Sequence, residues 1–325
     1  MFAKLRGWLI LTRGSNLPTV WSNLLVGWAI CYVFAETIPP FFFLLGGLLG
    51  LWVGVSFTYV GGMILNDAFD AKWDRTHRPQ RPIPAGLVSE RAATVVGFLF
   101  LLLGIFFTSV SAVQGHGRVV LVLSLVLAGL VLVYNRWHKG VTWAPAVMGL
   151  CRALLPIIGF FSGGGVIDDP SFHGFGLLRL LAHPFVLWAL TFSVTLVARH
   201  EAGVGRPPRW AEWLMYALPL PFIFLYPARA WTVIGCAVYW LWIWFSNRRN
   251  PLPGGVGRRV SDRLAAFPMM DFIGHGLFVY FAGPLGNSGS SSQSVWLGFA
   301  SLFACLVPPV CFGLTLLLRR WIPQT

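Results

Sequence analysis

Charged residues are scarce in this sequence, and acidic residues are the scarcest of them. They make up 11% of the 325 residues, with 11 Asp or Glu against 24 Lys or Arg. Soluble domains carry about 25% charged residues. Hydrophobic residues make up 56% of the chain, and the mean hydropathy is +0.71. The composition therefore excludes an ordinary soluble domain and indicates an integral membrane protein.

Cysteine is also rare, and its spacing carries no ligand pattern. The five cysteines are scattered through apolar segments: Cys31, Cys151, Cys236, Cys305 and Cys311. No pair has the close spacing of a zinc site, so we interpret them as small buried hydrophobic residues. We expect neither a disulfide framework nor a thiolate metal site.

The basic residues give a net charge of +13, but they lie in short loops between apolar segments. This distribution is the positive-inside signal of membrane proteins and excludes a nucleic-acid-binding patch. It predicts that the N-terminus faces the cytoplasm. We expect the membrane to be the cytoplasmic membrane of a bacterium, because the pattern is helical and not that of a barrel.

Ten apolar segments approach the roughly 20 residues that cross a bilayer. They are residues 17–34, 41–65, 92–113, 118–135, 142–162, 183–199, 212–226, 230–246, 264–284 and 294–318. The sequence therefore predicts an all-α bundle of nine or ten transmembrane helices. The apolar stretch within residues 1–16 is too short to span a bilayer, so we expect these residues to form an interfacial helix. Residues 17–325 then form a single transmembrane domain.

Three of the few acidic residues follow the second apolar segment directly. On a helix Asp67, Asp70 and Asp74 lie at i, i+3 and i+7, so their carboxylates share one face. Like charges repel unless a cation lies between them. Carboxylates without neighbouring Cys favour Mg²⁺, which leaves coordination positions for phosphate oxygens. A solvated loop whose charges pair among themselves is the alternative.

The next residues are basic and point to a diphosphate ligand. Arg75, Arg78 and Arg81 follow the aspartates, and guanidinium groups bind phosphate oxygens in a bidentate geometry. On this hypothesis the helix face that carries the three aspartates holds a diphosphate through a bridging metal ion. Asn66 would orient the first carboxylate or a metal-bound water.

The segment N-D-x-x-D-x-x-x-D-R at residues 66–75, followed by R-P-x-R-P-I-P-x-G at 78–86, resembles the first aspartate motif of the UbiA superfamily of intramembrane prenyltransferases. The resemblance implies an all-helical fold, usually of nine spans, with Mg²⁺, a polyprenyl diphosphate donor and a lipophilic, usually aromatic, acceptor. Soluble isoprenyl synthases also use Asp-rich motifs, but the composition excludes them. Together with G-L-C-R at 149–152 and A-R-H-E at 198–201, the pattern is most similar to the EboC-like branch.

The resemblance also implies a second carboxylate motif, and residues 195–203 depart from it. Glu201 is the one carboxylate there, preceded by Arg199 and His200. Glu201 could complete the Mg²⁺ shell, and Arg199 could bind the diphosphate directly. A degenerate site without transferase chemistry is the other interpretation.

Polar residues inside or at the ends of apolar segments complete the predicted site. Arg152 needs an anionic partner, for which a substrate diphosphate, Glu201 or a helix-to-helix ion pair would serve. Asn23 lines a pocket or joins two helices. Asp271 and His275 form a polar stripe. The region with Tyr134, Asn135 and Lys139 resembles a polar stretch of the family after the fourth span.

We therefore predict a Mg²⁺-dependent prenyltransferase with a prenyl diphosphate donor, a lipophilic or aromatic acceptor and contacts to membrane lipids. The predicted metal ligands are Asp67, Asp70, Asp74 and Glu201, the first three of them catalytic. The predicted substrate-binding residues are Asn23, Asn66, Arg75, Arg78, Arg81, Tyr134, Asn135, Lys139, Arg152, Arg199, Glu201 and Asp271. A degenerate protein that binds or carries a lipid diphosphate is the alternative. A CDP-alcohol phosphotransferase lacks support, because no Asp-Gly and Ala-Arg lead precedes Asp67.

Overall fold

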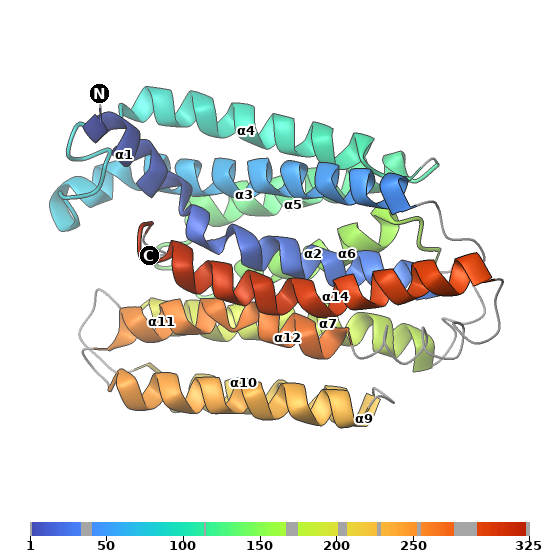
Figure 1. The fold of residues 1–325 in the computed structure, drawn as a ribbon. Helices are drawn as coiled ribbons and strands as arrows, with labels where there is room; N and C mark the ends of the chain where they lie inside the picture. The colour runs from blue at the N-terminus through green and yellow to red at the C-terminus, as the bar shows by residue number, and fades with distance from the viewer. Residues whose placement is uncertain are drawn as a thin grey trace.

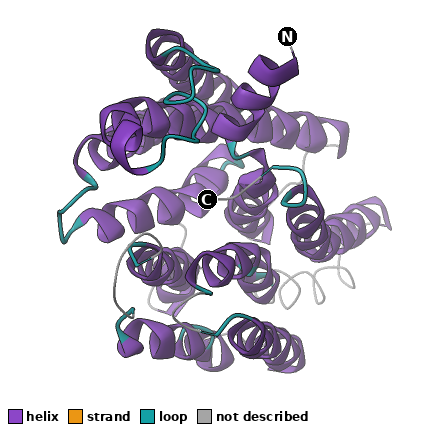
Figure 2. Ribbon diagram, turned by 90° about the vertical axis from the view of Figure 1, so that its left-hand side faces the viewer, coloured by secondary structure: helices purple, strands orange, loops and turns teal. Residues whose placement is uncertain are grey.

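A computed structural model describes residues 2–33, 41–113, 115–166, 175–200, 207–225, 229–251, 255–275 and 291–322. Throughout these ranges the regular structure is helical, and no strand occurs in them (Figure 2). The prediction of an all-α fold is confirmed. The helices lie side by side with their long axes roughly parallel, and the two chain ends lie at the same end of the bundle (Figure 1).

The first part of the chain forms two short helices followed by five longer ones. They are α1 (Phe2–Thr12), the short 3₁₀ helix η1 (Gly14–Asn16), α2 (Leu17–Val33), α3 (Phe41–His77), α4 (Glu90–Val110), α5 (Gly117–Trp137) and α6 (Ala144–Ser162). Helix α3 packs along α4, and α6 packs between α2 and α7. Of these helices, α2, α3, α6 and α7 contribute to the wall of the cavity described below.

The later part of the chain combines long and short helices. It comprises α7 (Phe175–Ala198), α8 (Arg209–Ala217), α9 (Leu220–Leu225), α10 (Arg229–Arg249), α11 (Val256–Ala265), α12 (Phe267–Gly274) and α14 (Ser291–Leu318). Pro219 lies between α8 and α9, within the predicted segment 212–226, and a proline removes a backbone donor from a helix. That apolar segment is therefore divided into two short helices.

Five helices among the described residues are long and apolar enough to cross a membrane. They lie within α3, α4, α5, α6 and α7, at Leu45–His77, Glu90–Val110, Gly117–Trp137, Ala144–Ser162 and Leu180–Ala198. A shorter apolar stretch, Cys305–Leu318, belongs to α14. The total of nine or ten spans stays a prediction, as does the interfacial position of residues 1–16.

Glycines allow α2 and α6 to approach closely. A Cβ added to Gly27 would overlap the carbonyl of Pro156, and one added to Gly159 would overlap the carbonyl of Leu24. Small residues at such crossings let two membrane helices pack backbone against backbone. The close crossing brings the polar side chains of α2 and α6 within hydrogen-bonding distance of each other.

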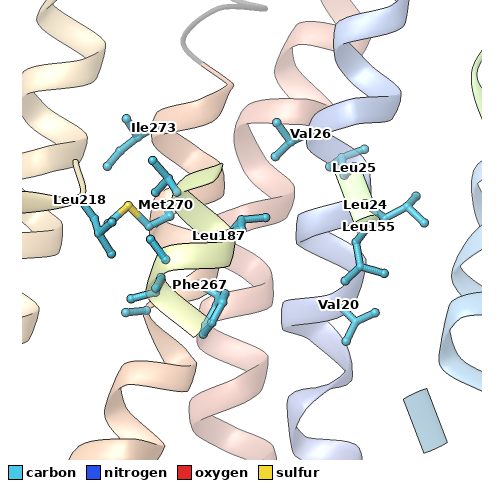
Figure 3. Packing of buried hydrophobic residues seen from close by; sticks show 14 of the residues in the cluster. Val20, Leu24, Leu25, Val26, Leu155, Leu187, Leu218, Phe267, Met270 and Ile273 are labelled. Carbon is cyan, nitrogen blue, oxygen red and sulfur yellow. The ribbon is translucent and has the colours of Figure 1, made fainter. Parts of the chain in front are cut away.

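The largest group of buried apolar side chains lies where α2, α6, α7 and α12 meet (Figure 3). Leu24 of α2, Leu155 of α6, Leu187 of α7 and Met270 of α12 belong to it. Each of these side chains is at most 5% exposed. The polar groups between these helices are therefore surrounded by a packed apolar core.

Helix α3 extends beyond its apolar part and carries the aspartate motif on its last three turns. It ends at His77, and the backbone N–H of Arg78 still donates to the Asp74 carbonyl at 2.8 Å. The chain then turns at Gly86, whose φ of +74° suits a residue without a Cβ. Ser89 begins α4 by accepting a hydrogen bond from the Ala92 N–H at 3.2 Å. The turn holds the basic segment after the motif against the end of α3.

Candidate functional site

Three aspartates at the end of α3 meet four basic side chains from other parts of the chain. We call Asp67, Asp70 and Asp74 with Arg13, Arg81, His138 and Lys139 the outer cluster. The three aspartates are buried, at 5%, 8% and 1% exposure. Arg81 Nη1 lies 3.1 Å from Asp67 Oδ1 and 2.9 Å from Asp74 Oδ2. One guanidinium thus bridges two carboxylates, as their shared helix face allows.

Arg13 reaches Asp67 from the N-terminal segment. Its Nη2 lies 2.9 Å from Asp67 Oδ1. Its backbone has φ 44° and ψ 38°, a left-handed conformation that is uncommon outside glycine and breaks the chain between α1 and η1. Burial lowers the pKa of Arg13, but the Asp67 carboxylate raises it, and the net pKa lies above its ordinary value. Arg13 therefore stays charged in the site.

Asp70 contacts two residues that follow α5. Lys139 Nζ lies 2.7 Å from Asp70 Oδ1, and His138 Nε2 lies 3.4 Å from Asp70 Oδ2. The Lys139 ammonium also lies 4.1 Å from the centre of the Trp73 ring, a cation-π contact. His138 stacks on Tyr134 with ring centres 5.1 Å apart. The end of α5 is thus fixed against the aspartates.

An asparagine pair joins α3 to α5 beside the aspartates. Asn66 Nδ2 donates to Asn135 Oδ1 at 3.2 Å, and Asn135 Nδ2 donates to the Gly62 carbonyl at 2.8 Å. Both side chains are buried. The structure thus places the Asn66 amide on Asn135, where it links α3, which carries the aspartates, to α5, which His138 and Lys139 follow.

A cavity of about 220 Å³ lies in the bundle between α2, α3, α5, α6 and α7, with α11 also contributing to its wall, and Arg13 of the outer cluster is on its lining. Leu127, Val131 and Val194 are among its apolar lining residues. Its lining also includes Arg13 and Arg152, together with Tyr59, Tyr134 and Asn135. The cavity is therefore apolar in its walls and has two arginines on its lining.

A second polar group lies within the apolar core, and we call it the inner network. Arg152 Nη1 donates to Thr19 Oγ1 at 3.0 Å and to Asn23 Oδ1 at 2.9 Å. Asn23 Nδ2 donates to both carboxylate oxygens of Asp271, at 3.0 and 2.8 Å. His183 Nε2 lies 2.9 Å from Asp271 Oδ1. Asn23, His183 and Asp271 have no exposed surface.

The remaining predicted residues are placed less centrally. Arg75 pairs with Glu90 at 2.8 Å, where both side chains are about half exposed. Arg78 is half-buried and has no side-chain hydrogen bond or ion pair to the described residues. Arg199 donates to the Val141 carbonyl. Glu201 lies outside the described residues.

The outer cluster has the donor chemistry of a Mg²⁺ site but holds cationic side chains on its carboxylates. Among the described residues no three His, Cys, Asp or Glu side chains converge as a metal-binding group. Asp74 Oδ1 is buried and has no hydrogen-bond partner within the described part of the chain. Oxygen donors without a thiol fit a hard cation. The residues therefore fit Mg²⁺ in kind, and binding requires Arg13, Arg81 and Lys139 to release carboxylate oxygens.

Sequence reasoning missed Arg13, His138 and His183. Arg13 lies 54 positions before Asp67, and His183 lies 88 positions before Asp271, so neither proximity follows from one sequence. His138 directly precedes Lys139, which the sequence predicts as a substrate-binding residue. This adjacency was the signal that could have identified His138. The sequence predicts a divalent cation between the aspartates. In the structure the side chains that contact them are Arg81, Arg13 of the N-terminal segment, and His138 and Lys139, which follow α5.

A profile of the UbiA prenyltransferase family matches residues 20–253, more than half of the chain. The chain belongs to the UbiA prenyltransferase family. The resemblance seen in the aspartate motif is thereby confirmed. Neither the profile nor the relatives described next specify the EboC-like branch, which stays a prediction.

Curated relatives carry prenyltransferase names. A digeranylgeranylglyceryl phosphate synthase of Methanosarcina mazei is 30% identical over 208 residues, which are 61% of this chain and 66% of that protein. A protoheme IX farnesyltransferase of Geobacter sulfurreducens is 30% identical over 162 residues, 48% of this chain and 56% of that protein. The matched regions thus span less than two thirds of either relative.

A solved structure shares the fold over most of its length. An apo structure of a UbiA homolog from Aeropyrum pernix superposes with a TM-score of 0.57 and 17% identity, covering 80% of this chain and 97% of that one. At this identity the likeness concerns the fold alone. It supports the UbiA-type arrangement of the helices.

Proposed function

We propose that this protein is a membrane-embedded prenyltransferase that moves a prenyl group from an allylic prenyl diphosphate to a lipophilic acceptor and depends on Mg²⁺. One observation carries the proposal. In a chain of the UbiA family, three buried aspartates and four basic side chains gather in one cluster, and Arg13 of this cluster lines an apolar cavity. Carboxylates for a metal and cations for phosphate oxygens are what ionisation of an allylic diphosphate requires.

Residues of the outer cluster would bind the diphosphate by exchanging partners. Arg13, Arg81 and Lys139 contact carboxylates in the structure and would turn to phosphate oxygens as the donor enters. Asp67 and Asp70, with Asp74 and Glu201, would then hold Mg²⁺. The metal would supply charge neutralisation for the departing diphosphate.

The apolar walls of the cavity suit the prenyl chain. Leu127 and Val131 of α5 and Val194 of α7 line it, and Tyr134 lies on its lining as well. Apolar surface binds a hydrocarbon chain by excluding water, and an aromatic ring stabilises a cation that passes over its face. This arrangement would also keep water from the allylic cation.

We propose that the acceptor is an aromatic or another lipophilic molecule. The names of the two relatives describe different products, a digeranylgeranylglyceryl phosphate and a farnesylated protoheme IX. We also propose that the N-terminus and the outer cluster face the cytoplasm, on the positive-inside pattern of the loops.

Purified full-length protein in neutral detergent tests the proposal. We would incubate it with radiolabelled geranyl, farnesyl and geranylgeranyl diphosphates, with and without Mg²⁺, and with a panel of aromatic acids and membrane lipids. We expect diphosphate release that needs both Mg²⁺ and an acceptor. Turnover that persists in the Asp67→Ala/Asp70→Ala double variant would contradict the proposal.

A carrier of lipid diphosphates is the second candidate. The second motif retains one carboxylate, Glu201, and the first-motif aspartates already have cationic partners. A protein of this kind would bind the donor without releasing diphosphate. Tight Mg²⁺-dependent binding with no product from any acceptor would favour it over the transferase.

A further inference from the structure

Arg152 lies in the apolar core with most of its hydrogen-bonding capacity unused. It is 9% exposed, and its Nη1 donates to Thr19 and Asn23. A guanidinium has five N–H donors. Nε and Nη2 make no hydrogen bond to the described part of the chain, and Arg152 lines the cavity. The edge of the guanidinium that carries these N–H groups is therefore available to a ligand.

The partners of Arg152 are neutral, although a carboxylate lies close behind them. Asn23 accepts from Arg152 through its carbonyl and donates from its amide to both oxygens of Asp271. The amide separates the two charges, so no direct ion pair forms between Arg152 and Asp271. His183 contacts the same carboxylate at 2.9 Å. Asp271 thus compensates the arginine from a distance and leaves its positive field directed to the cavity.

Such an arrangement has a chemical consequence. A buried charge is costly unless it is paired, and an arginine inside a membrane helix is correspondingly rare. The Phe267 ring covers one face of the guanidinium, with its centre 4.8 Å from Cζ. The Phe267 ring does not cover the edge of the guanidinium that carries Nε and Nη2. A guanidinium binds carboxylate or phosphate in a bidentate geometry through such an edge.

We propose that Arg152 is the recognition point for an anionic group, a carboxylate or a phosphate, on the acceptor. Asn23 and Thr19 act as positioning residues that hold the guanidinium without neutralising it. This inference rests on the proposed function, in which the outer cluster binds the donor. Arg13 and Arg152 line the same cavity, so the donor diphosphate and the acceptor anion occupy separate cationic positions on it.

Binding measurements with defined probes test the inference. The donor site of the full-length protein is first filled with geranyl thiolodiphosphate and Mg²⁺, and this titration alone tests the proposed function. Decyl phosphate, decanoate and the neutral decanol are then titrated by calorimetry. We expect the wild-type protein to bind at least one of the two anions tenfold or more tightly than decanol, and the stronger one identifies the anion class.

Substitutions decide whether Arg152 is responsible. Arg152→Gln should abolish the preference for the anion while leaving the affinities for decanol and for the donor analogue within twofold. Arg152→Lys should retain part of the preference, because the charge remains without the fork. Asp271→Asn should tighten anion binding, since it removes the compensating charge. A role in helix packing alone predicts a loss of affinity for all three probes instead.

Arg263→Gln is the matched control. Arg263 is also buried and pairs with Glu212 at 2.8 Å, but it does not line the cavity. Its loss should leave the preference for the anion unchanged. An anion preference that survives in Arg152→Gln, or one that falls equally in Arg263→Gln, would overturn the inference. If Arg152→Gln shows no cooperative thermal transition, the opposite shifts expected for Arg152→Lys and Asp271→Asn decide the question.

Discussion

The outer cluster and the inner network handle charge in different ways. In the outer cluster each aspartate has a basic side chain within 3.1 Å, and Arg81 serves two of them. In the inner network Arg152 and Asp271 are joined through the neutral amide of Asn23. In a direct ion pair each charge is offset by the partner that it contacts, whereas an intervening amide keeps the two charges farther apart and weakens their attraction.

This difference assigns different tasks to the two regions. The basic residues of the outer cluster come from the ends of helices and from loops, which can change partners when a diphosphate enters. The inner network joins α2, α6, α7 and α12 inside a packed core, so its geometry is held by the fold. The outer cluster is therefore suited to exchange of partners and the inner network to fixed recognition.

Removing a carboxylate from the outer cluster should have the largest effect on turnover. We expect Asp70→Asn to lower kcat by at least about 100-fold, since it removes charge that holds the metal and the leaving group. Steady-state diphosphate release measures the change. Glu90→Gln is the control, because Glu90 pairs with Arg75 at the surface. Equal losses in the two variants would refute a special role for Asp70.

Separating α2 from α6 should damage the inner network through the fold. Gly159→Val places side-chain atoms against the Leu24 carbonyl, and overpacking costs about 1–3 kcal/mol. We expect a lower thermal midpoint in detergent. Gly129 offers a comparison, because a Cβ added there meets no atom within 4 Å. Gly129→Val should therefore leave the thermal midpoint nearly unchanged. Equal midpoints in the two variants would contradict the close crossing of α2 and α6.

Lys139 sharpens the comparison because it belongs to the outer cluster but is about a third exposed. Lys139→Met removes its contact with Asp70 and a proposed phosphate ligand. We expect the donor KM to rise roughly tenfold, which corresponds to about 1.4 kcal/mol, with a smaller change in kcat. Lys72→Met, on an exposed position off the shared helix face, should change neither constant. An unchanged KM in Lys139→Met would argue against a phosphate contact.

Arg75 should have the smallest effect of the basic residues considered. Its partner is Glu90, both side chains are about half exposed, and exposed pairs contribute about 0.2–1 kcal/mol. We expect Arg75→Gln to change turnover and donor KM by less than twofold. A tenfold rise in KM would show that Arg75 leaves Glu90 for the donor, as the sequence first indicated.

The outer cluster was largely predictable from sequence, because its aspartates follow one another on a single helix. The spacing of Asp67, Asp70 and Asp74 fixes a common face, and a helix needs no long-range information. Arg13 was not predictable in this way, because its place depends on a left-handed turn at the N-terminal segment. Arg75 was selected for its position beside the motif, but it projects toward α4 instead.

The inner network was predicted as separate residues and not as a group. Asn23, Arg152 and Asp271 each stood out as polar residues in apolar segments, but the spacing between them is 248 positions for Asn23 and Asp271. Small residues such as Gly27 and Gly159 determine which helices cross closely. Such crossings are easier to recognise in a structure than in a single sequence. The division of residues 212–226 at Pro219 likewise needed the structure.

Donor binding is the measurement that tests the central claim most directly. Calorimetric titration of geranyl thiolodiphosphate into the wild-type protein, Asp70→Asn and Arg152→Gln, each with and without Mg²⁺, separates the two regions. The account predicts Mg²⁺-dependent binding that is lost in Asp70→Asn and retained in Arg152→Gln. Binding that is independent of Mg²⁺, or that depends on Arg152 and not on Asp70, would contradict it.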